Sequence, residues 1–446
     1  MNKGQFLQSL PLEQRKIHCV GIGGAGVSAL AEILLEAGFE ITGSDMETNE
    51  NIQRLQSCGA RIAIAGHDAK NLDSDGYGGG IMTAAAQLSN PETAELLRRG
   101  VMVWKRGEFL GELCRCYRRS VLVAGSHGKS STTAMLGWIL NKLNADAGLL
   151  LGAAFKDRTP GARLGNGDIL VAEADESDGT IALLSGELAL VVNADGDHAW
   201  NEAALQQQEH NFQRLARACR HTIYIDSPNC RRIFENMENV QALTAEDMNR
   251  IADLLPEHFI GYEKINAVLA AAGAEYLGFD LAAATAALRD YPGIARRQSE
   301  VFRSSRATVL EDYAHHPTEL AASLEVIKAR YPGHRLLIVF QPHRYLRLRK
   351  YFRDFVRILS EPDYNVLVMP VFSAWENAPV DALENSDLAA AINQAGGNAS
   401  VIDRNYAESA GKAVELAAGF DTSVLIALIG AGDVNSLTPE LIKILK

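Results

Sequence analysis

A glycine-rich loop with a lysine and a row of hydroxyl side chains lies in the first third of the chain. Residues 125–133 read Gly-Ser-His-Gly-Lys-Ser-Ser-Thr-Thr and directly follow the apolar run 120–124. Gly125 and Gly128 have no Cβ atom, so backbone N–H groups can approach phosphate oxygens. Lys129 supplies a cation, and the Ser130 hydroxyl can bind Mg²⁺. The pattern predicts a phosphate-binding loop, although it lacks the first glycine of G-x-x-x-x-G-K-[ST]. The alternative is a glycine turn before a helix with a solvated lysine.

An acidic run follows a second apolar stretch, residues 168–172. Residues 173–178 read Glu-Ala-Asp-Glu-Ser-Asp, and four carboxylates at one strand end repel one another unless cations share the site. A metal is therefore expected there, and His198, beyond the next strand, is a candidate to complete its shell with Glu173 and Ser130. The alternatives are a solvated acidic turn and a structural histidine.

A second glycine motif lies near the N-terminus. Residues 21–26 read Gly-Ile-Gly-Gly-Ala-Gly between an apolar run and a helical pattern, which is the context that G-x-G-x-x-G requires. Asp45 follows the next expected strand, where a ribose hydroxyl would be met. The motif by itself indicates NAD, another nucleotide or a diphosphate; a tight turn without a ligand is the alternative.

Basic side chains gather after an apolar run in the last third of the chain. His343, Arg344 and Arg347 follow the run 335–340. Guanidinium groups bind carboxylate or phosphate in bidentate fashion, so this loop is suited to an anionic group of a substrate. The alternative is that both arginines are exposed surface.

Each of these motifs follows a short apolar run, and such runs alternate with helical patterns along the whole chain. This alternation predicts an α/β protein with mainly parallel sheets, whose ligands lie at the carboxyl ends of the strands. The expected strands are 17–21, 39–42, 61–65, 80–83, 101–104, 120–124, 168–172, 188–193, 221–225, 307–310, 335–340, 365–369 and 423–429, and the expected helices include 27–37, one opening near Lys129, 202–217, 245–255 and 266–276.

Length and composition limit the possible function. A chain of 446 residues predicts two or three domains, with a break at Pro292 and Gly293. A net charge of −12 argues against broad binding to nucleic acid or anionic membranes. Six scattered cysteines indicate reduced thiols, and neither a signal peptide nor an apolar span long enough to cross a bilayer is apparent. A cytoplasmic protein is expected.

Taken together, the motifs resemble those of the Mur ligase family, in the same order and over nearly the whole chain. The resemblance implies three α/β domains: a Rossmann-like UDP-substrate-binding domain (1–113), a central P-loop ATPase domain with a mostly parallel sheet (114–295) and a Rossmann-like amino-acid-binding domain (296–446). It also implies that the first domain binds UDP rather than NAD. The segments that carry it are residues 21–26, 125–133, 173–178, 195–198, 312–319, 341–345 and 430–433.

The activity that the resemblance implies is ATP-driven amide formation in peptidoglycan precursor synthesis. ATP phosphorylates the lactyl carboxylate of UDP-N-acetylmuramate, and the amino group of L-alanine attacks the acyl phosphate. The cofactors would be ATP and Mg²⁺, with no nucleic acid partner, no membrane insertion and a monomeric or homodimeric state. The alternatives are a Mur-type ligase that adds a peptide or another small amino acid, a catalytically impaired nucleotide-binding paralogue and an NAD-dependent oxidoreductase.

The resemblance also assigns roles to individual positions. His315 and His316 form the family's histidine pair, and either could be the base that relieves alanine of its proton. The implied site residues are, for catalysis, His127, Lys129, Glu173 and His198; for the nucleotide, Gly125, Ser126, His127, Gly128, Lys129, Ser130, Ser131 and Asn266; for the UDP-substrate, Gly23, Gly24, Ala25, Gly26, Ser44 and Asp45; for the amino acid, His315, His343, Arg344 and Arg347; and for the metal, Ser130, Glu173 and His198.

The chain departs from the family pattern at several positions. Ser126, Ser130 and Ser131 stand where threonines are usual, and each keeps a hydroxyl group. Tyr262 and Glu263 replace a His-Asn pair that helps to hold adenine, so only Asn266 is carried over there. The central segment is short between residues 198 and 261, and Leu346 and Leu348 occupy positions that are often hydroxylic.

Overall fold

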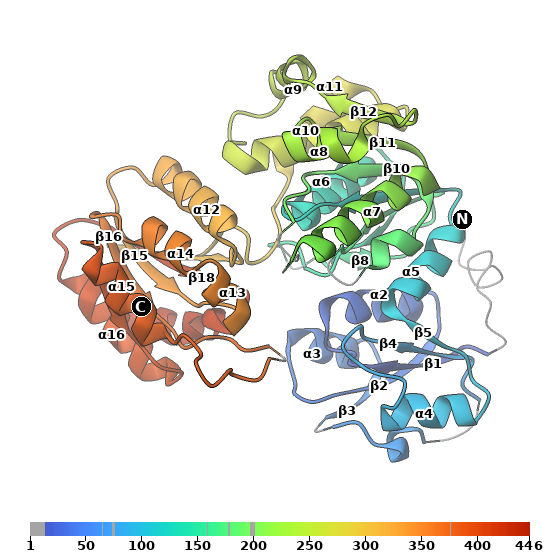
Figure 1. Ribbon diagram of the computed structural model, residues 1–446, viewed down its shortest axis with the longest axis horizontal. Coiled ribbons are helices and arrows are strands. Elements are labelled where there is room, and N and C mark those ends of the chain that lie inside the picture. The colour runs from blue at the N-terminus through green and yellow to red at the C-terminus, as the bar shows by residue number, and fades with distance from the viewer. Residues whose placement is uncertain are drawn as a thin grey trace. The chain divides into compact units, whose positions relative to one another are not determined.

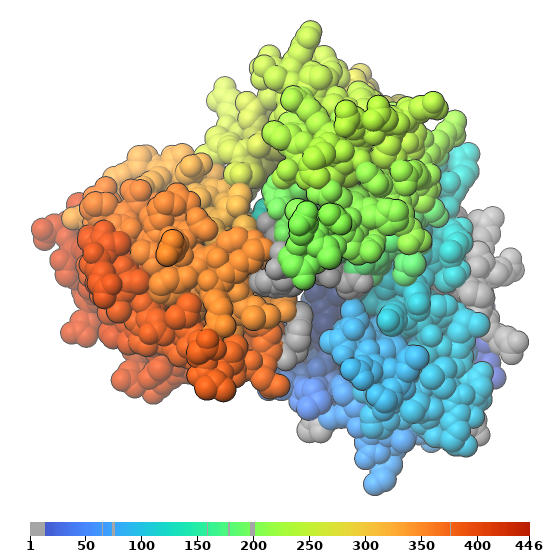
Figure 2. All heavy atoms as spheres, viewed as in Figure 1, coloured from blue at the N-terminus to red at the C-terminus, as the bar shows by residue number. Residues whose placement is uncertain are grey.

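The computed structural model describes residues 14–64, 66–73, 76–157, 159–176, 179–196, 201–374 and 376–446. The chain divides into two compact units, Met1–Gly293 and Ile294–Lys446. Figure 1 shows the first unit from blue to yellow and the second in orange and red, and Figure 2 shows their surfaces in the same colours. The described residues form three sheets, two in the first unit and one in the second.

The first sheet has five parallel strands in the order β3-β2-β1-β4-β5. From β1 the chain adds β2 and β3 on one side of the sheet and then β4 and β5 on the other side. The carboxyl end of β1, where the glycine motif begins, is therefore the switch point at which such sheets place ligands. Its elements are β1 (Lys16–Val20), α2 (Ala25–Glu36), β2 (Glu40–Asp45), α3 (Glu50–Ser57), β3 (Arg61–Ile64), β4 (Gly79–Met82), α4 (Pro91–Arg98), β5 (Val103–Lys105) and α5 (Arg106–Arg115).

The second sheet has seven strands in the order β12-β11-β10-β6-β9-β7-β8, of which only β8 is antiparallel to its neighbour. The central position of β6 places the glycine-lysine loop between the ends of β9 and β10. The elements are β6 (Arg119–Ala124), α6 (Lys129–Lys142), β7 (Gly148–Leu150), β8 (Ala162–Arg163), β9 (Ile169–Glu173), β10 (Gly186–Val191), α7 (Glu202–Ala218), β11 (Cys219–Ile225), α8 (Pro228–Phe234), β12 (Val240–Leu243), α9 (Ala245–Ala252), α10 (Gly261–Tyr276) and α11 (Leu281–Ala287).

The two sheets of the first unit are packed together through their helices and loops. The Glu36 carboxylate at the end of α2 accepts a hydrogen bond from the Leu164 backbone N–H at 2.7 Å. A Cβ atom on Gly107 of α5 would lie 2.2 Å from the Thr180 side chain, so the two segments are in direct contact there. Helix α5 runs across the predicted 113/114 boundary, and the three domain boundaries stay predictions.

The third sheet has the order β13-β14-β18-β15-β16-β17, with only β13 antiparallel. Successive residues of β15 alternate between two cores: Leu336, Ile338 and Phe340 belong to one, and Leu337 and Val339 to the other. Both faces of the sheet are therefore covered by helices. The elements are β13 (Ser299–Arg303), β14 (Ala307–Asp312), α12 (Pro317–Arg330), β15 (Arg335–Phe340), α13 (Tyr345–Lys350), α14 (Phe352–Leu359), β16 (Tyr364–Val368), α15 (Asn385–Gln394), β17 (Asn398–Val401), α16 (Tyr406–Ala418), β18 (Val424–Ile429) and α17 (Thr438–Leu445).

The fold class expected from the sequence is confirmed: the protein is α/β with three sheets. Two local expectations need correction. Strand β2 extends to Asp45, so Ser44 lies inside the strand rather than beyond it. Helix α10 begins at Gly261, so Tyr262 and Glu263 lie in its first turn rather than before it. The short strands β7, β8, β12, β13 and β17 were not expected, because few residues and edge positions leave a weak hydrophobic pattern.

Two simpler expectations concern cysteines and membrane spans. All six cysteines are free, and five of them are buried. Among the helices of the described residues, none combines the length and the apolar composition that crossing a bilayer requires.

Candidate active site

The loop between β6 and α6 is built around two glycines in the left-handed region. Gly125 has φ +142° and Gly128 has φ +79°. A Cβ atom on Gly128 would lie 2.5 Å from Asn266 Oδ1, because α10 brings this buried side chain against the loop. Glycine is therefore required at this position both by its φ angle and by the close approach. The predicted loop residues and Asn266 thus lie together, although 137 positions separate Lys129 from Asn266.

Asn193, which follows β10, holds this loop from the neighbouring strand. Its Oδ1 accepts a hydrogen bond from the His127 backbone N–H at 2.9 Å, and its Nδ2 donates to the His127 carbonyl at 3.1 Å. The Asp195 backbone N–H donates to Ser126 Oγ at 3.0 Å. Both polar groups of the Asn193 side chain are thus hydrogen-bonded to the backbone of His127, and these bonds fix the course of the loop.

Lys129, the first residue of α6, is paired inside the protein. Its Nζ lies 2.8 Å from Glu176 Oε2 and donates to the Gly125 carbonyl at 2.5 Å. Burial alone would lower the pKa of Lys129, but the carboxylates of Glu176, Asp175 and Glu173 outweigh it and raise the pKa. Burial raises the pKa of Glu176 to about 7, against the effect of Lys129. Lys129 is therefore protonated and faces an acidic surrounding.

Three carboxylates of the acidic run after β9 contact side chains of the protein. Glu176 forms an ion pair with Lys129, and Asp175 Oδ2 lies 3.6 Å from the Arg106 guanidinium. Glu173 Oε2 accepts a hydrogen bond from Ser130 Oγ at 2.9 Å. Two of these carboxylates thus lie beside protein cations, Asp178 lies outside the described residues, and the metal expected from the acidic run stays a prediction.

The donor chemistry of Ser130 and Glu173 nevertheless suits Mg²⁺. A hydroxyl oxygen and a carboxylate oxygen 2.9 Å apart, beside a phosphate-type loop, are the oxygen ligands that this ion takes in nucleotide sites. His198, the third expected ligand, lies outside the described residues. Among the described residues there is no group of three or more His, Cys, Asp and Glu side chains placed to hold a metal, so the set Ser130, Glu173 and His198 stays a prediction.

In the first sheet the glycine loop is tied to the end of β2. Asp45 Oδ2 accepts the Gly23 backbone N–H at 2.8 Å, and the side chains of Asn49 and Asn51 donate to the Gly23 carbonyl at 3.1 and 2.9 Å. The expected residues 23–26 and Asp45 therefore lie together at the N-terminus of α2. Arg106 packs over this turn, since a Cβ atom on Gly26 would lie 2.4 Å from its Cδ atom.

Ser44 differs from its neighbours because its hydroxyl belongs to a buried network. Ser44 Oγ donates to Glu92 Oε2 at 2.5 Å and lies 2.7 Å from His67 Nδ1. Asn71 Nδ2 donates to Glu92 Oε1 at 2.6 Å, and His18 Nε2 lies 3.5 Å from Glu92 Oε2. Burial alone would raise the pKa of Glu92, but these partners outweigh it and lower the pKa to about 2. The Ser44 hydroxyl is therefore hydrogen-bonded within the protein, and no sequence pattern indicated this network.

In the second unit the predicted basic residues lie beside His315. Arg347 Nη1 lies 3.2 Å from His343 Nδ1, and the rings of His315 and His343 are 5.4 Å apart. Arg344 Nε donates to Glu376 Oε1 at 2.7 Å. Arg347 is 3% exposed, so the interpretation of both arginines as exposed surface is wrong. Arg344 is thus neutralised by a carboxylate, whereas Arg347 contacts a histidine ring nitrogen.

Several residues of these sites were missed by sequence reasoning: Asn193, Arg106, Glu92, Glu376 and Glu319. Glu176 was singled out as part of the acidic run, but not as the partner of Lys129. Asn193 and Glu176 stand at strand ends beside the loop, and this position was the available signal. The partners of the others depend on distant segments, and no local pattern marks them.

Known proteins match this chain over nearly its whole length. Residues 16–118 match the Mur ligase family, catalytic domain, and residues 296–432 match the Mur ligase, glutamate ligase domain. The UDP-N-acetylmuramate–L-alanine ligase of Thiobacillus denitrificans is 34% identical, over 96% of this chain and 98% of that protein. The ligase of the same name from Halorhodospira halophila is 35% identical, over 96% and 93%. The chain belongs to the Mur ligase family.

Solved structures of Mur ligases share the fold. The UDP-N-acetylmuramate–alanine ligase of Thermotoga maritima has a TM-score of 0.77 at 22% identity, covering 96% of this chain and 99% of that one. The murein peptide ligase of Psychrobacter arcticus has a TM-score of 0.67 at 20% identity, covering 97% and 98%. As a Mur ligase, the protein is an ATP-dependent, amide-forming enzyme. The family and enzyme class expected from the sequence are confirmed, and the oxidoreductase alternative is wrong.

Proposed function

We propose that this Mur ligase joins L-alanine to the lactyl carboxylate of UDP-N-acetylmuramate, with consumption of ATP, in the synthesis of peptidoglycan precursors. The observation that carries the proposal is similarity along the full chain: relatives named UDP-N-acetylmuramate–L-alanine ligase are 31% to 35% identical, and most span about 96% of the chain. The loop between β6 and α6, which contains Lys129, would act in the first step, the transfer of the γ-phosphoryl group of ATP.

The reaction has two balanced steps. A carboxylate oxygen of the sugar substrate attacks the γ-phosphorus of ATP, and the bond from phosphorus to the ADP oxygen breaks. The amine nitrogen of alanine then attacks the carbonyl carbon of the acyl phosphate, the bond to the phosphate oxygen breaks, and phosphate leaves with the electron pair and a proton from nitrogen. Activation is needed because a free carboxylate is a poor acceptor for an amine.

The residues of the β6–α6 loop stabilise the charge on the moving phosphoryl group. The Lys129 ammonium and the backbone N–H groups at the start of α6 face anionic oxygens there. Mg²⁺, when bound, would offset the phosphate charge, and Ser130 and Glu173 are the residues that would hold it. His198 is proposed as a further ligand, and His127 is proposed to lie beside the acceptor carboxylate.

The two substrates are assigned to different sheets. The loop 23–26 at the N-terminus of α2, tied down by Asp45, is proposed to receive the diphosphate of the UDP-sugar. The carboxylate of alanine is proposed to meet Arg347 and His343, with Arg344 shaping the loop through its bond to Glu376. We also propose that the protein acts in the cytoplasm, as a monomer or homodimer.

The decisive experiment measures phosphate release from ATP by the purified protein with Mg²⁺ and UDP-N-acetylmuramate, scanning single amino acids and a tripeptide. Turnover that requires L-alanine supports the proposal. Turnover with the tripeptide alone would make the protein a peptide ligase, which is the second candidate because the Psychrobacter arcticus enzyme shares its fold. No turnover with any acceptor would indicate an impaired paralogue, the alternative raised by Tyr262 and Glu263.

Two lysine variants of helix α6 connect this assay to the loop. Lys129→Ala is expected to lower kcat by at least about a thousandfold, because it removes the cation beside the transferred group. Lys142→Ala is the matched control, since Lys142 ends the same helix and its Nζ lies over the Trp138 ring. Equal activity of the two variants would refute the assignment of the loop.

A further inference from the structure

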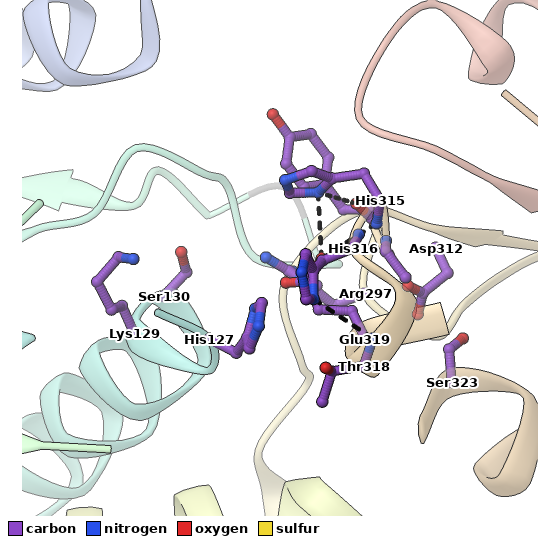
Figure 3. A network of polar contacts seen from close by, with 12 residues as sticks. His127, Lys129, Ser130, Arg297, Asp312, His315, His316, Thr318, Glu319 and Ser323 are labelled. Atoms are coloured by element: carbon purple, nitrogen blue, oxygen red, sulfur yellow. Dashed lines mark hydrogen bonds and ion pairs between the residues drawn. The ribbon is translucent and has the colours of Figure 1, made fainter. Parts of the chain in front are cut away.

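The ammonium group of Lys129, the cation of the proposed nucleotide loop, has three acceptors within the protein. Figure 3 draws its side chain at the start of α6, together with that of Ser130. The Nζ atom lies 2.8 Å from Glu176 Oε2, 2.5 Å from the Gly125 carbonyl oxygen and 3.4 Å from the Ser126 carbonyl oxygen. An ammonium group has three N–H donors, so the three acceptors use all of them. A phosphate oxygen can bind this group only if one acceptor gives way.

Two of the three acceptors are backbone carbonyls, and the rest of the loop holds them in place. Gly125 has φ +142°, and a Cβ atom on it would lie 3.0 Å from the Asn193 carbonyl oxygen, so its backbone is packed against the residue after β10. Ser126 Oγ accepts the Asp195 backbone N–H at 3.0 Å. These contacts leave little room for either carbonyl to move. Glu176 is therefore the partner that the lysine can exchange for a phosphate.

Glu176 is an anion, like the phosphate for which it would be exchanged. Its buried side chain follows β9, the strand that pairs with β6. A phosphate oxygen within about 3 Å of Lys129 Nζ would lie within about 6 Å of Glu176 Oε2, and like charges at this distance repel one another strongly where water is excluded. A buried carboxylate that loses its cation is also destabilised. Glu176 and the phosphates of a nucleotide therefore compete for one ammonium group.

The neighbouring carboxylate in the acidic run has a different partner. Asp175 Oδ2 lies 3.6 Å from Arg106 Nη2, and its side chain is 36% exposed. Water and salt screen the field of such a group, whereas they screen a buried ion pair much less. Asp175 and Glu176 thus carry the same charge one position apart, but Glu176 is the one in direct contact with Lys129.

We propose that Glu176 is a positioning residue that competes with the phosphates of the nucleotide: it holds the Lys129 ammonium group in an ion pair and gives it up when the β- and γ-phosphates bind. This inference rests on the proposed function, in which the loop between β6 and α6 receives the phosphates of ATP. The ion pair lowers the affinity for every nucleotide whose phosphates reach Lys129. ADP is one of them, so the competition favours release of this product.

The test measures the dissociation constants of ATP, ADP and AMP for the whole protein with Mg²⁺, by isothermal titration calorimetry. Glu176→Gln removes the charge but keeps the size of the side chain and an acceptor oxygen. We expect it to bind ATP and ADP about fivefold or more tighter, because the competing ion pair is lost. AMP lacks the β- and γ-phosphates, so its affinity should change less than about twofold. A residue that only supported the fold would instead weaken binding when replaced.

Asp175→Asn is the matched control, because it removes the adjacent carboxylate of the same run. Its dissociation constants for ATP and ADP should stay within about twofold of the wild-type values, since the exposed Asp175 carboxylate is screened by water. Equal tightening in Asp175→Asn and Glu176→Gln would overturn the proposal. The net charge of the acidic run, and not the contact with Lys129, would then set the affinity.

A crystal structure of the wild type with ADP and Mg²⁺ tests the exchange without depending on the folding of a variant. The distance from Lys129 Nζ to the nearer Glu176 carboxylate oxygen should exceed about 4 Å, the limit of an ion pair, and a phosphate oxygen should take its place. An ion pair that persists beside the bound phosphates would overturn the proposal. Unchanged or weaker ATP binding by folded Glu176→Gln would do the same.

Lys129→Ala separates this inference from the proposed function. If this variant binds ATP as tightly as the wild type, the loop does not receive the phosphates, and the assignment of the loop and the inference fail together. If Lys129→Ala weakens ATP binding while Glu176→Gln leaves it unchanged, the inference alone is refuted.

Discussion

Gly128→Ala tests whether the nucleotide loop depends on the close contact between Gly128 and Asn266. Gly128 has φ +79°, and an alanine in the left-handed region costs about 1 to 2 kcal/mol relative to glycine. Its Cβ atom would also lie 2.5 Å from Asn266 Oδ1 and 3.0 Å from Val192 Cγ1. Because Asn266 is buried, it has to move against packed neighbours, which costs about 1 to 3 kcal/mol more.

Gly278→Ala separates the two contributions. Gly278 has φ +95° and follows α10 in the same unit, and a Cβ atom added to it would meet nothing within 4 Å among the described residues. This variant carries the cost of the φ angle alone. The difference between the two variants in free energy of unfolding should therefore be about 1 to 3 kcal/mol, with Gly128→Ala the less stable.

Urea unfolding of the two variants, followed with the KM for ATP, provides the measurement. Gly128→Ala should raise the KM for ATP at least about tenfold, because the displaced backbone no longer directs its N–H groups at the phosphates. Gly278→Ala should leave this KM unchanged. Equal unfolding free energies in the two variants, or a normal KM in Gly128→Ala, would refute the reasoning.

Two further predictions concern the metal and the buried carboxylate. Ser130→Ala should raise the Mg²⁺ concentration for half-maximal activity about tenfold, whereas Ser130→Thr should retain the wild-type value because the hydroxyl remains; equal titration curves would argue against Ser130 as a ligand. Glu92→Gln should lower the free energy of unfolding at pH 7 by about 3 kcal/mol, since the pKa of Glu92 is about 2 in the folded chain against an ordinary 4.5. Because the pKa of Glu92 is lower in the folded chain than in the unfolded chain, its ionised carboxylate stabilises the fold above pH 4.5, and this contribution is lost as pH falls towards 2. The unfolding free energies of the wild type and Glu92→Gln, measured in urea, should therefore converge on acidification. A difference that does not depend on pH would contradict this prediction.

The candidate loop illustrates how far local patterns reach. Residues 120–133 predicted a strand, a phosphate-type turn and a helix, and β6 and α6 occupy the places of the strand and the helix. The pattern works because glycine, lysine and hydroxyl groups act through neighbours only a few residues apart. The acidic run was expected at the same sheet edge, and it lies there because β6 and β9 are neighbouring parallel strands that end at this edge.

Local sequence patterns could not predict the ion-pair and hydrogen-bond partners of the charged groups. Glu173 and Glu176 are three residues apart and chemically alike, yet one accepts from Ser130 and the other pairs with Lys129. Arg344 and Arg347 belong to one basic loop, yet it is Arg344 that Glu376 neutralises. Carboxylate repulsion likewise could not show that Lys129 and Arg106 lie beside Glu176 and Asp175, since these cations come from α6 and α5.

The sequence by itself therefore determined the family, the α/β class, the order of the motifs and the side chains available for chemistry, because these depend on residue type and short-range periodicity. The tertiary structure alone decided which acid faces Lys129 and that Ser44 points into a buried network. Hydrogen bonds and ion pairs act over about 3 Å, and only the folded chain brings residues from distant positions within that distance.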